Sequence, residues 1–280
     1  NNHAISENQA GFWRKHSTVD HIFTLYATVQ KCMSKKGRKL YVAFVDFRKA
    51  FDSVRHDKLL ECLKSQGVKG KFFASLKAMY NSLLSCVRSK SQLSEMFECP
   101  TGVRQGCVLS PTLFSLFINQ LASDVEERGK HGIQLLPDIM ELFILLFADD
   151  VALLSASPGG LQNQLNILQT CCNRMKLNVN IDKTKIMVFR KGGFLGSHEK
   201  WFYNGQQLEV VNSYCYLGFN FTTMLSIKKG TNHLATKGKR GLVQLHRVFQ
   251  KYKEMAPGVF FKVFDAKFSQ CYYMHQRCGD

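Results

Sequence analysis

The sequence lacks several features that would place it in common functional classes. It has no run of about 18 uncharged apolar residues, which a membrane-spanning helix needs. None of its ten cysteines forms a Cys-x-x-Cys pair, so a zinc ribbon or knuckle is not supported and reduced thiols are expected. There is no internal repeat, low-complexity linker or N-terminal signal peptide. These absences argue against a membrane protein, a zinc-ribbon protein and a repeat array.

Acidic residues are scarce relative to basic ones. The 280 residues include 38 Lys and Arg against 21 Asp and Glu, which gives a net charge of +17. This balance favours a polyanionic partner, and nucleic acid fits better than an acidic membrane surface. Hydrophobic residues make up 45% of the chain, enough for a folded core of one large domain or two small ones.

Helical and strand patterns are mixed along the chain without a strict alternation. Helices are expected at 18–35, 57–65, 71–83, 111–127, 158–175 and, rich in basic residues, 234–252. Strands are expected at 40–45, 85–89, 96–99, 142–147, 151–155, 185–189 and within 209–221. This order favours an α+β fold over a doubly wound parallel sheet.

Three aspartates lie within or directly after apolar segments that are expected to be buried. Asp46 ends the apolar run 40–45, and Asp149 and Asp150 interrupt two apolar runs that read as a hairpin. A buried, unpaired carboxylate is costly, and adjacent ones repel each other. A divalent cation removes that cost, and Mg²⁺ prefers carboxylate oxygens together with substrate phosphates. The alternative is a polar turn and a strand end without function.

Several segments, in this order, resemble reverse transcriptases of non-LTR (LINE-type) retrotransposons. The four main ones are FVDFRKAFDSV (44–54), GVRQGCVLSP (102–111), FADD (147–150) and NIDKT (180–184). QAGF (9–12), STVD (17–20) and YLG (216–218) are also similar to that family. Proteins of group II introns share this order and are the nearest relatives to exclude.

The resemblance implies a polymerase palm, an antiparallel sheet backed by helices, that carries out two-metal nucleotidyl transfer. It assigns two Mg²⁺ ions, with Mn²⁺ as a substitute, to Asp46, Asp149, Asp150 and the backbone carbonyl of Phe47. Lys183 matches a lysine that protonates the departing pyrophosphate. The nucleotide would lie against Phe47, Arg48, Lys49, Ala50, Phe51, Gln105 and Gly106. Template and primer would contact Arg104, Tyr216, Leu217, Gly218, Lys237, Lys239 and Arg240.

Some of these positions have simpler explanations. The Phe51 ring would exclude a ribose 2′-hydroxyl and so select deoxynucleotides, but it could be ordinary core. Lys183 could be a surface lysine, and Arg104 could be solvated. Residues 216–218 could be a buried strand, and the basic tail a solvated helix face.

The resemblance also predicts a division of the chain and its partners. Residues 1–39 would be partial fingers, 40–222 the palm with inserted fingers helices at about 56–100, and 223–280 the start of a truncated basic thumb. The expected partners are an RNA template, a DNA primer or target, and deoxynucleoside triphosphates, without a membrane. The expected location is a nuclear and cytoplasmic ribonucleoprotein. The competing hypotheses are an inactive nucleic-acid-binding remnant and an RNA-dependent RNA polymerase, against which Phe51 argues.

Overall fold

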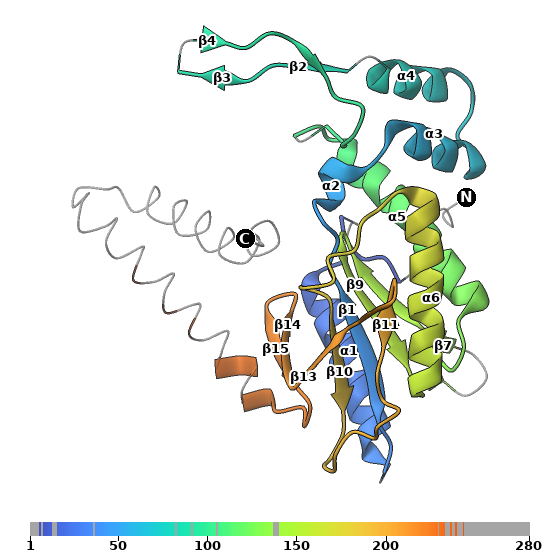
Figure 1. Cartoon of the computed structure of the whole chain (residues 1–280), viewed down its shortest axis with the longest axis vertical. Helices are drawn as coiled ribbons and strands as arrows, with labels where there is room; N and C mark the ends of the chain where they lie inside the picture. Colours follow the sequence, from blue (N-terminus) through green and yellow to red (C-terminus); the bar gives the residue numbers. More distant parts are fainter. Residues whose placement is uncertain are drawn as a thin grey trace.

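The protein is described by a computed structural model that covers residues 6, 8–12, 16–35, 37–81, 83–90, 92–104, 106–136, 140–228, 230–232, 236, 239 and 243. Its centre is a five-stranded sheet in the order β13-β10-β1-β9-β8. These strands are β1 (Leu40–Val45), β8 (Ile144–Phe147), β9 (Asp150–Ser155), β10 (Lys185–Phe189) and β13 (Glu209–Val211). Mixed helices and strands around this sheet confirm the predicted α+β class (Figure 1).

The central strand β1 is antiparallel to both of its neighbours. Tyr41 pairs with Val188 of β10 and with Ser155 of β9. The expected antiparallel sheet is therefore confirmed for four strands, because β8 and β9 also pair antiparallel. The fifth strand departs from it, since β13 runs parallel to β10 after an intervening connection that contains β11 (Phe202–Tyr203) and β12 (Gln206–Gln207).

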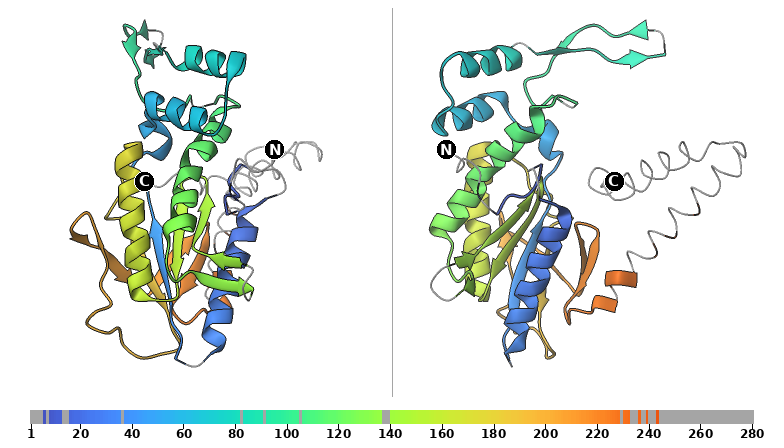
Figure 2. Two further views of the ribbon diagram at one scale, coloured as in Figure 1. Left: turned by 90° about the vertical axis from the view of Figure 1, so that its right-hand side faces the viewer. Right: turned by 180° about the vertical axis from the view of Figure 1, so that it is seen from behind.

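Both faces of the sheet are covered, which explains why β1 is apolar throughout. Tyr41, Ala43 and Val45 point into a core shared with α5 (Ser110–Arg128) and α6 (Pro158–Met175). Leu40, Val42 and Phe44 alternate to the other face. There they meet α1 (Thr18–Ser34) and the hairpin of β14 (Ser213–Tyr216) and β15 (Phe219–Thr222). Figure 2 shows α1 and α6 on opposite sides of the sheet.

A second part of the chain extends beyond the sheet at the end where β1 finishes (Figure 1). It follows the short α2 (Ala50–Ser53) and contains α3 (His56–Ser65) and α4 (Gly70–Tyr80). An arm of two-residue strands comes next, with β2 (Leu84–Ser85) paired to β5 (Phe97–Glu98) and β3 (Arg88–Ser89) paired to β4 (Gln92–Leu93). Another hairpin, β6 (Ile133–Leu136) and β7 (Met140–Leu142), follows α5.

Most predicted elements are confirmed to within a few residues. Ser17 is the N-cap of α1, and the Asp20 carboxylate accepts a hydrogen bond from the Ser17 N–H at 2.7 Å. The predicted helix at 234–252 lies outside the described residues apart from three isolated positions. All eight described cysteines are free. Among the described residues, no helix is long and apolar enough to span a membrane.

Candidate active site: three aspartates at one end of the sheet

The sheet register brings the three predicted acids together. Val45 of β1 pairs with Val151 of β9, and the next residues toward the same end are Asp46 and Asp150. Phe147 pairs with Asp150, so Ala148 and Asp149 form the two-residue turn of the β8–β9 hairpin. Asp46 therefore directly follows β1, the strand beside the hairpin that presents Asp149 and Asp150.

Burial and mutual repulsion disfavour charge on these carboxyls. Burial, the largest cause, and like-charge repulsion from Asp149 and Asp46 together raise the pKa of Asp150 to about 7. Burial also raises the pKa of Asp149, and Asp46 adds to the rise. Such repulsion acts only over short distances, so the carboxyl groups of Asp46, Asp149 and Asp150 lie near one another. Among the ion pairs formed by the described residues, none involves Asp149 or Asp150.

The NIDKT segment packs directly on Asp46. The N–H of Asn180 donates to the Asp46 carbonyl at 2.8 Å, and the Asp46 N–H donates to the Thr184 hydroxyl at 3.2 Å. Burial raises the pKa of Asp46, while nearby Lys183 and a hydrogen bond from the Asn180 side chain lower it. Lys183 is exposed and lies close enough to act on the Asp46 charge. The structure thus places the predicted general acid beside the predicted metal ligand.

The donor set suits Mg²⁺, but no complete cage exists among the described residues. The carboxylates of Asp149 and Asp150 have raised pKa values and form none of the ion pairs found among the described residues, and a divalent cation would relieve that cost. Within the described part of the chain, however, no group of three or more acid, histidine or cysteine side chains is arranged to hold a metal ion by itself. Mg²⁺ is commonly bound through one or two carboxylates plus substrate phosphates, so nucleotide oxygens would have to complete such a site.

The residues after Asp46 form the next wall of the site. Phe47 bridges to Val179, Arg48 and Lys49 are exposed, and Ala50 is buried at the start of α2. Phe51 is partly buried, with its ring stacked on Phe114 at 4.2 Å between centroids. One face of the Phe51 ring therefore packs in the hydrophobic core, as the simpler explanation expects. The ring is still a candidate for excluding a ribose 2′-hydroxyl.

The GVRQG segment lies against this wall. The Val103 N–H donates to the Phe51 carbonyl at 2.9 Å, and Gly102 donates to the Val54 carbonyl at 2.8 Å. Gly102 has φ 94, and a Cβ there would meet the Asp52 carbonyl at 3.2 Å, so the close approach requires glycine. Arg104 and Gly106 are exposed, and Gln105 lies outside the described residues.

The β14–β15 hairpin also adjoins the carboxylates. Leu217 and Gly218 form its two-residue turn with φ 47 and 86. Tyr216 is buried, and Asp150 contributes to the rise of its pKa. This supports the alternative that residue 216 is a buried strand residue, while the turn residues Leu217 and Gly218 are only partly buried. Of the predicted basic contacts, Lys239 is exposed, and Lys237 and Arg240 lie outside the described residues.

Sequence reasoning gave no role to Tyr214, which faces the same acids. Its ring stacks on Phe44 at 4.3 Å, nearly parallel at 7°. Burial raises its pKa, and Asp150 and Asp46 raise it further. Residues i and i+2 of a strand point to the same face, so the predicted role of Tyr216 could have indicated that Tyr214 also faces the site.

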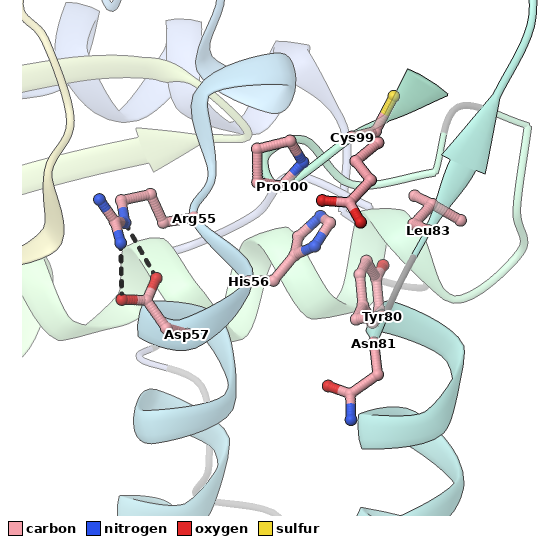
Figure 3. A pocket seen from close by; sticks show the side chains of 9 residues that line it. Arg55, His56, Asp57, Tyr80, Asn81, Leu83, Cys99 and Pro100 are labelled. Atoms are coloured by element: carbon pink, nitrogen blue, oxygen red, sulfur yellow. Dashed lines mark hydrogen bonds and ion pairs between the residues drawn. The ribbon is translucent and has the colours of Figure 1, made fainter. Parts of the chain in front are cut away.

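A separate pocket lies at the root of the arm, away from the three aspartates. It has a volume of about 320 Å³ and is lined by residues of α3, the end of α4 and the arm (Figure 3). The His56 ring packs edge-on against Tyr80 and donates through Nε2 to the Gly102 carbonyl at 2.8 Å. Arg55 and Asp57 form a two-pronged ion pair at its edge. None of the predicted site residues lines this pocket; its contact with the GVRQG segment is the hydrogen bond from His56 to Gly102.

Comparison with known proteins agrees with this geometry. The family model described as reverse transcriptase (RNA-dependent DNA polymerase) matches residues 2–221. The chain is 30% identical to a probable RNA-directed DNA polymerase from transposon BS of Drosophila melanogaster, over 64% of this chain and 20% of that protein. It is 24% identical to the RNA-directed DNA polymerase from mobile element jockey of the same species, over 96% of this chain and 29% of that protein.

Solved structures support the same fold. Telomerase from Candida albicans, in complex with a fragment of telomeric RNA, matches with a TM-score of 0.55 at 13% identity, over 78% of this chain and 35% of that one. The chain spans 20% and 29% of the two curated relatives named above. The predicted resemblance to polymerases of retrotransposons is confirmed by these relatives. The chain belongs to the reverse transcriptase (RNA-dependent DNA polymerase) family.

Proposed function

We propose that the chain copies RNA into DNA by adding deoxynucleotides to a primer 3′-hydroxyl. The observation that carries this proposal is the convergence of Asp46, Asp149 and Asp150, from two neighbouring strands, on one end of the sheet. The pKa values of all three carboxyls are raised, because burial disfavours their charged forms. Strongly shifted pKa values are common at catalytic sites. Family membership narrows the chemistry to nucleotidyl transfer.

The three carboxylates and the carbonyl of Phe47 would hold two Mg²⁺ ions, or Mn²⁺ in their place. Bound there together with nucleotide phosphates, the ions would activate the primer hydroxyl and neutralise the pyrophosphate. Lys183, beside Asp46, would protonate the departing pyrophosphate. Phe51 and Ala50 would shape the space for the sugar, and Gly102 and Gly106 would let the backbone approach the base pair.

We propose the division of the chain that the family resemblance implies. Residues 40–222 would form the palm, with the helices and arm at about 56–100 inserted as fingers and residues 1–39 as a further part of the fingers. Residues 223–280 would begin a basic thumb. An RNA template and a DNA primer would lie across the end of the sheet near residues 104 and 216–218. We also propose action within a nuclear and cytoplasmic ribonucleoprotein, by analogy with the mobile-element relatives.

The second candidate is a binding remnant without catalysis. The net charge of +17 favours it, because binding to a polyanion needs no intact catalytic site. Primer extension on an RNA template with Mg²⁺ and deoxynucleotides separates the two candidates, provided that RNA binding is measured in parallel. A polymerase extends the primer, and Asp149→Ala abolishes extension while leaving RNA binding intact. RNA binding by the full-length protein without any extension, with Mg²⁺ or Mn²⁺, would establish the remnant instead.

A further inference from the structure

The turn that carries Asp149 adopts a backbone conformation that its own residues do not favour. Ala148 has φ 56, in the left-handed region, where a side chain is strained and glycine is usual. Ala148 is also buried, so water cannot satisfy its backbone groups. Something outside the hairpin must therefore hold this turn in place.

An extended segment at residues 8–11 lies along β8 and reaches the turn. The Ala10 N–H donates to the Leu146 carbonyl at 3.0 Å, and the Leu146 N–H donates to the Asn8 carbonyl at 2.9 Å. Asn8 is tied in turn to α5, because its side-chain amide donates to Glu126 at 2.7 Å. The segment is thus anchored both to the sheet and to a helix.

The side chain of Gln9 connects this segment to the turn. Gln9 is fully buried, and its Oε1 accepts hydrogen bonds from the N–H groups of Gly11 at 2.8 Å and Ala148 at 3.2 Å. Gly11 completes the contact, because a Cβ there would lie 2.1 Å from the Ala148 nitrogen. No side chain other than glycine's hydrogen fits between the segment and the turn.

We propose that Gln9 is a positioning residue that fixes the Ala148 backbone and thereby the place of the Asp149 carboxylate. The inference rests on the proposed function for its catalytic consequence, but the contact itself does not depend on it. Gln9 acts through the backbone of its neighbour rather than on the substrate. Asp149 follows Ala148 directly, so a turn free to leave the left-handed region would redirect that carboxylate.

Gln9→Met tests the proposal because it keeps the length and apolar volume of the side chain but removes the acceptor. Gln164→Met is the matched control, since Gln164 is equally buried and donates to the Leu154 carbonyl at 2.7 Å in another part of the sheet. Primer extension by Gln9→Met should fall about 10²-fold, as for a displaced catalytic group, while Gln164→Met loses thermal stability but keeps its activity.

Binding of Mn²⁺ in the presence of a deoxynucleoside triphosphate, measured by electron paramagnetic resonance, supplies a readout without catalysis. The proposal predicts weaker Mn²⁺ binding by Gln9→Met and unchanged binding by Gln164→Met. This readout holds even if the wild-type chain extends no primer, so failure of the proposed function and failure of the Gln9 contact are distinguishable. Equal Mn²⁺ binding by the wild type and Gln9→Met would overturn the proposal.

A second substitution separates positioning from general damage. Glycine adopts positive φ without strain, so Ala148→Gly added to Gln9→Met should restore extension and Mn²⁺ binding by about tenfold. If Gln9→Met does not fold, Gln9→Asn replaces it, because its shorter amide cannot reach both N–H groups. A Gln9→Asn chain with wild-type binding and activity, or a double variant without any recovery, would contradict the inference.

Discussion

The cost of charging the buried Asp150 carboxyl should appear in the free energy of unfolding of the protein. Its pKa of about 7 lies above the ordinary value of 3.8, so the folded state favours the protonated carboxyl. Metal-free stability should therefore fall as pH rises from about 4 to about 7 and stay low above that range. One pKa unit corresponds to about 1.4 kcal/mol, so the rise from 3.8 to about 7 sets an upper bound of about 4 kcal/mol. Because the three acids titrate together, we expect about half of this, a loss of about 2 kcal/mol.

Asp150→Asn should remove that loss. In EDTA at pH 8 the variant should resist urea better than the wild type, and the difference should vanish near pH 4, where the carboxyl is already neutral. Mg²⁺ at pH 8 should then stabilise the wild type more than the variant. A variant that is less stable than the wild type at pH 8 would show that Asp150 is paired rather than repelled.

Phe51 supports a second prediction at this scale. If its ring excludes a 2′-hydroxyl, Phe51→Ala should increase incorporation of ribonucleotides relative to deoxynucleotides about tenfold or more. Phe114→Leu is the control, because it removes the stacking partner of Phe51 and leaves the ring itself in place. Competition assays with both nucleotide types measure the ratio. An unchanged ratio in Phe51→Ala would mean that the ring serves only as core.

Among the elements, the β14–β15 hairpin depends on its turn. Gly218 has φ 86, and a Cβ at this position would have no neighbouring atom within 4 Å. The cost of Gly218→Ala is therefore purely conformational and should be about 1 kcal/mol. Gly159→Ala is the matched control, since Gly159 also has open space but lies in α6, where alanine is favoured. Urea unfolding that shows equal effects of the two changes would contradict this account of the turn.

The elements that sequence reasoning located best are those whose burial leaves a clear pattern. β1 was predicted with its observed bounds because all six of its residues are buried between two cores. The short strands β2–β5 of the arm have mostly exposed residues, so no alternation marks their bounds. α2 was missed because four residues are too few to show a helical period.

For the whole molecule, the convergence of the acids was predictable and the support around them was not. Asp46 and the hairpin aspartates each interrupt an apolar run, which a sequence shows directly. The parallel return of β13 and the docking of residues 8–11 on β8 arise from long-range backbone hydrogen bonds, which leave no local pattern. The role proposed for Gln9 therefore follows only from the fold.

The net charge of +17 yields a prediction for the molecule as a whole. Binding to RNA should weaken steeply with salt because cations are released from the phosphates, by about 10³-fold between 50 and 200 mM salt for six phosphate contacts. Filter binding across this range measures the slope. A salt-independent affinity would show that the basic residues do not contact the phosphate backbone.

The most direct test of the three-aspartate site is the rate of primer extension on an RNA template by single asparagine variants. Asp46→Asn, Asp149→Asn and Asp150→Asn should each lower the rate by about 10³-fold or more, as expected when charge stabilisation of the transition state is lost. Asp57→Asn, an exposed acid paired with Arg55 on α3, should extend at the wild-type rate. Extension at the wild-type rate by any one of the three variants would contradict the assignment of that carboxylate to the catalytic site.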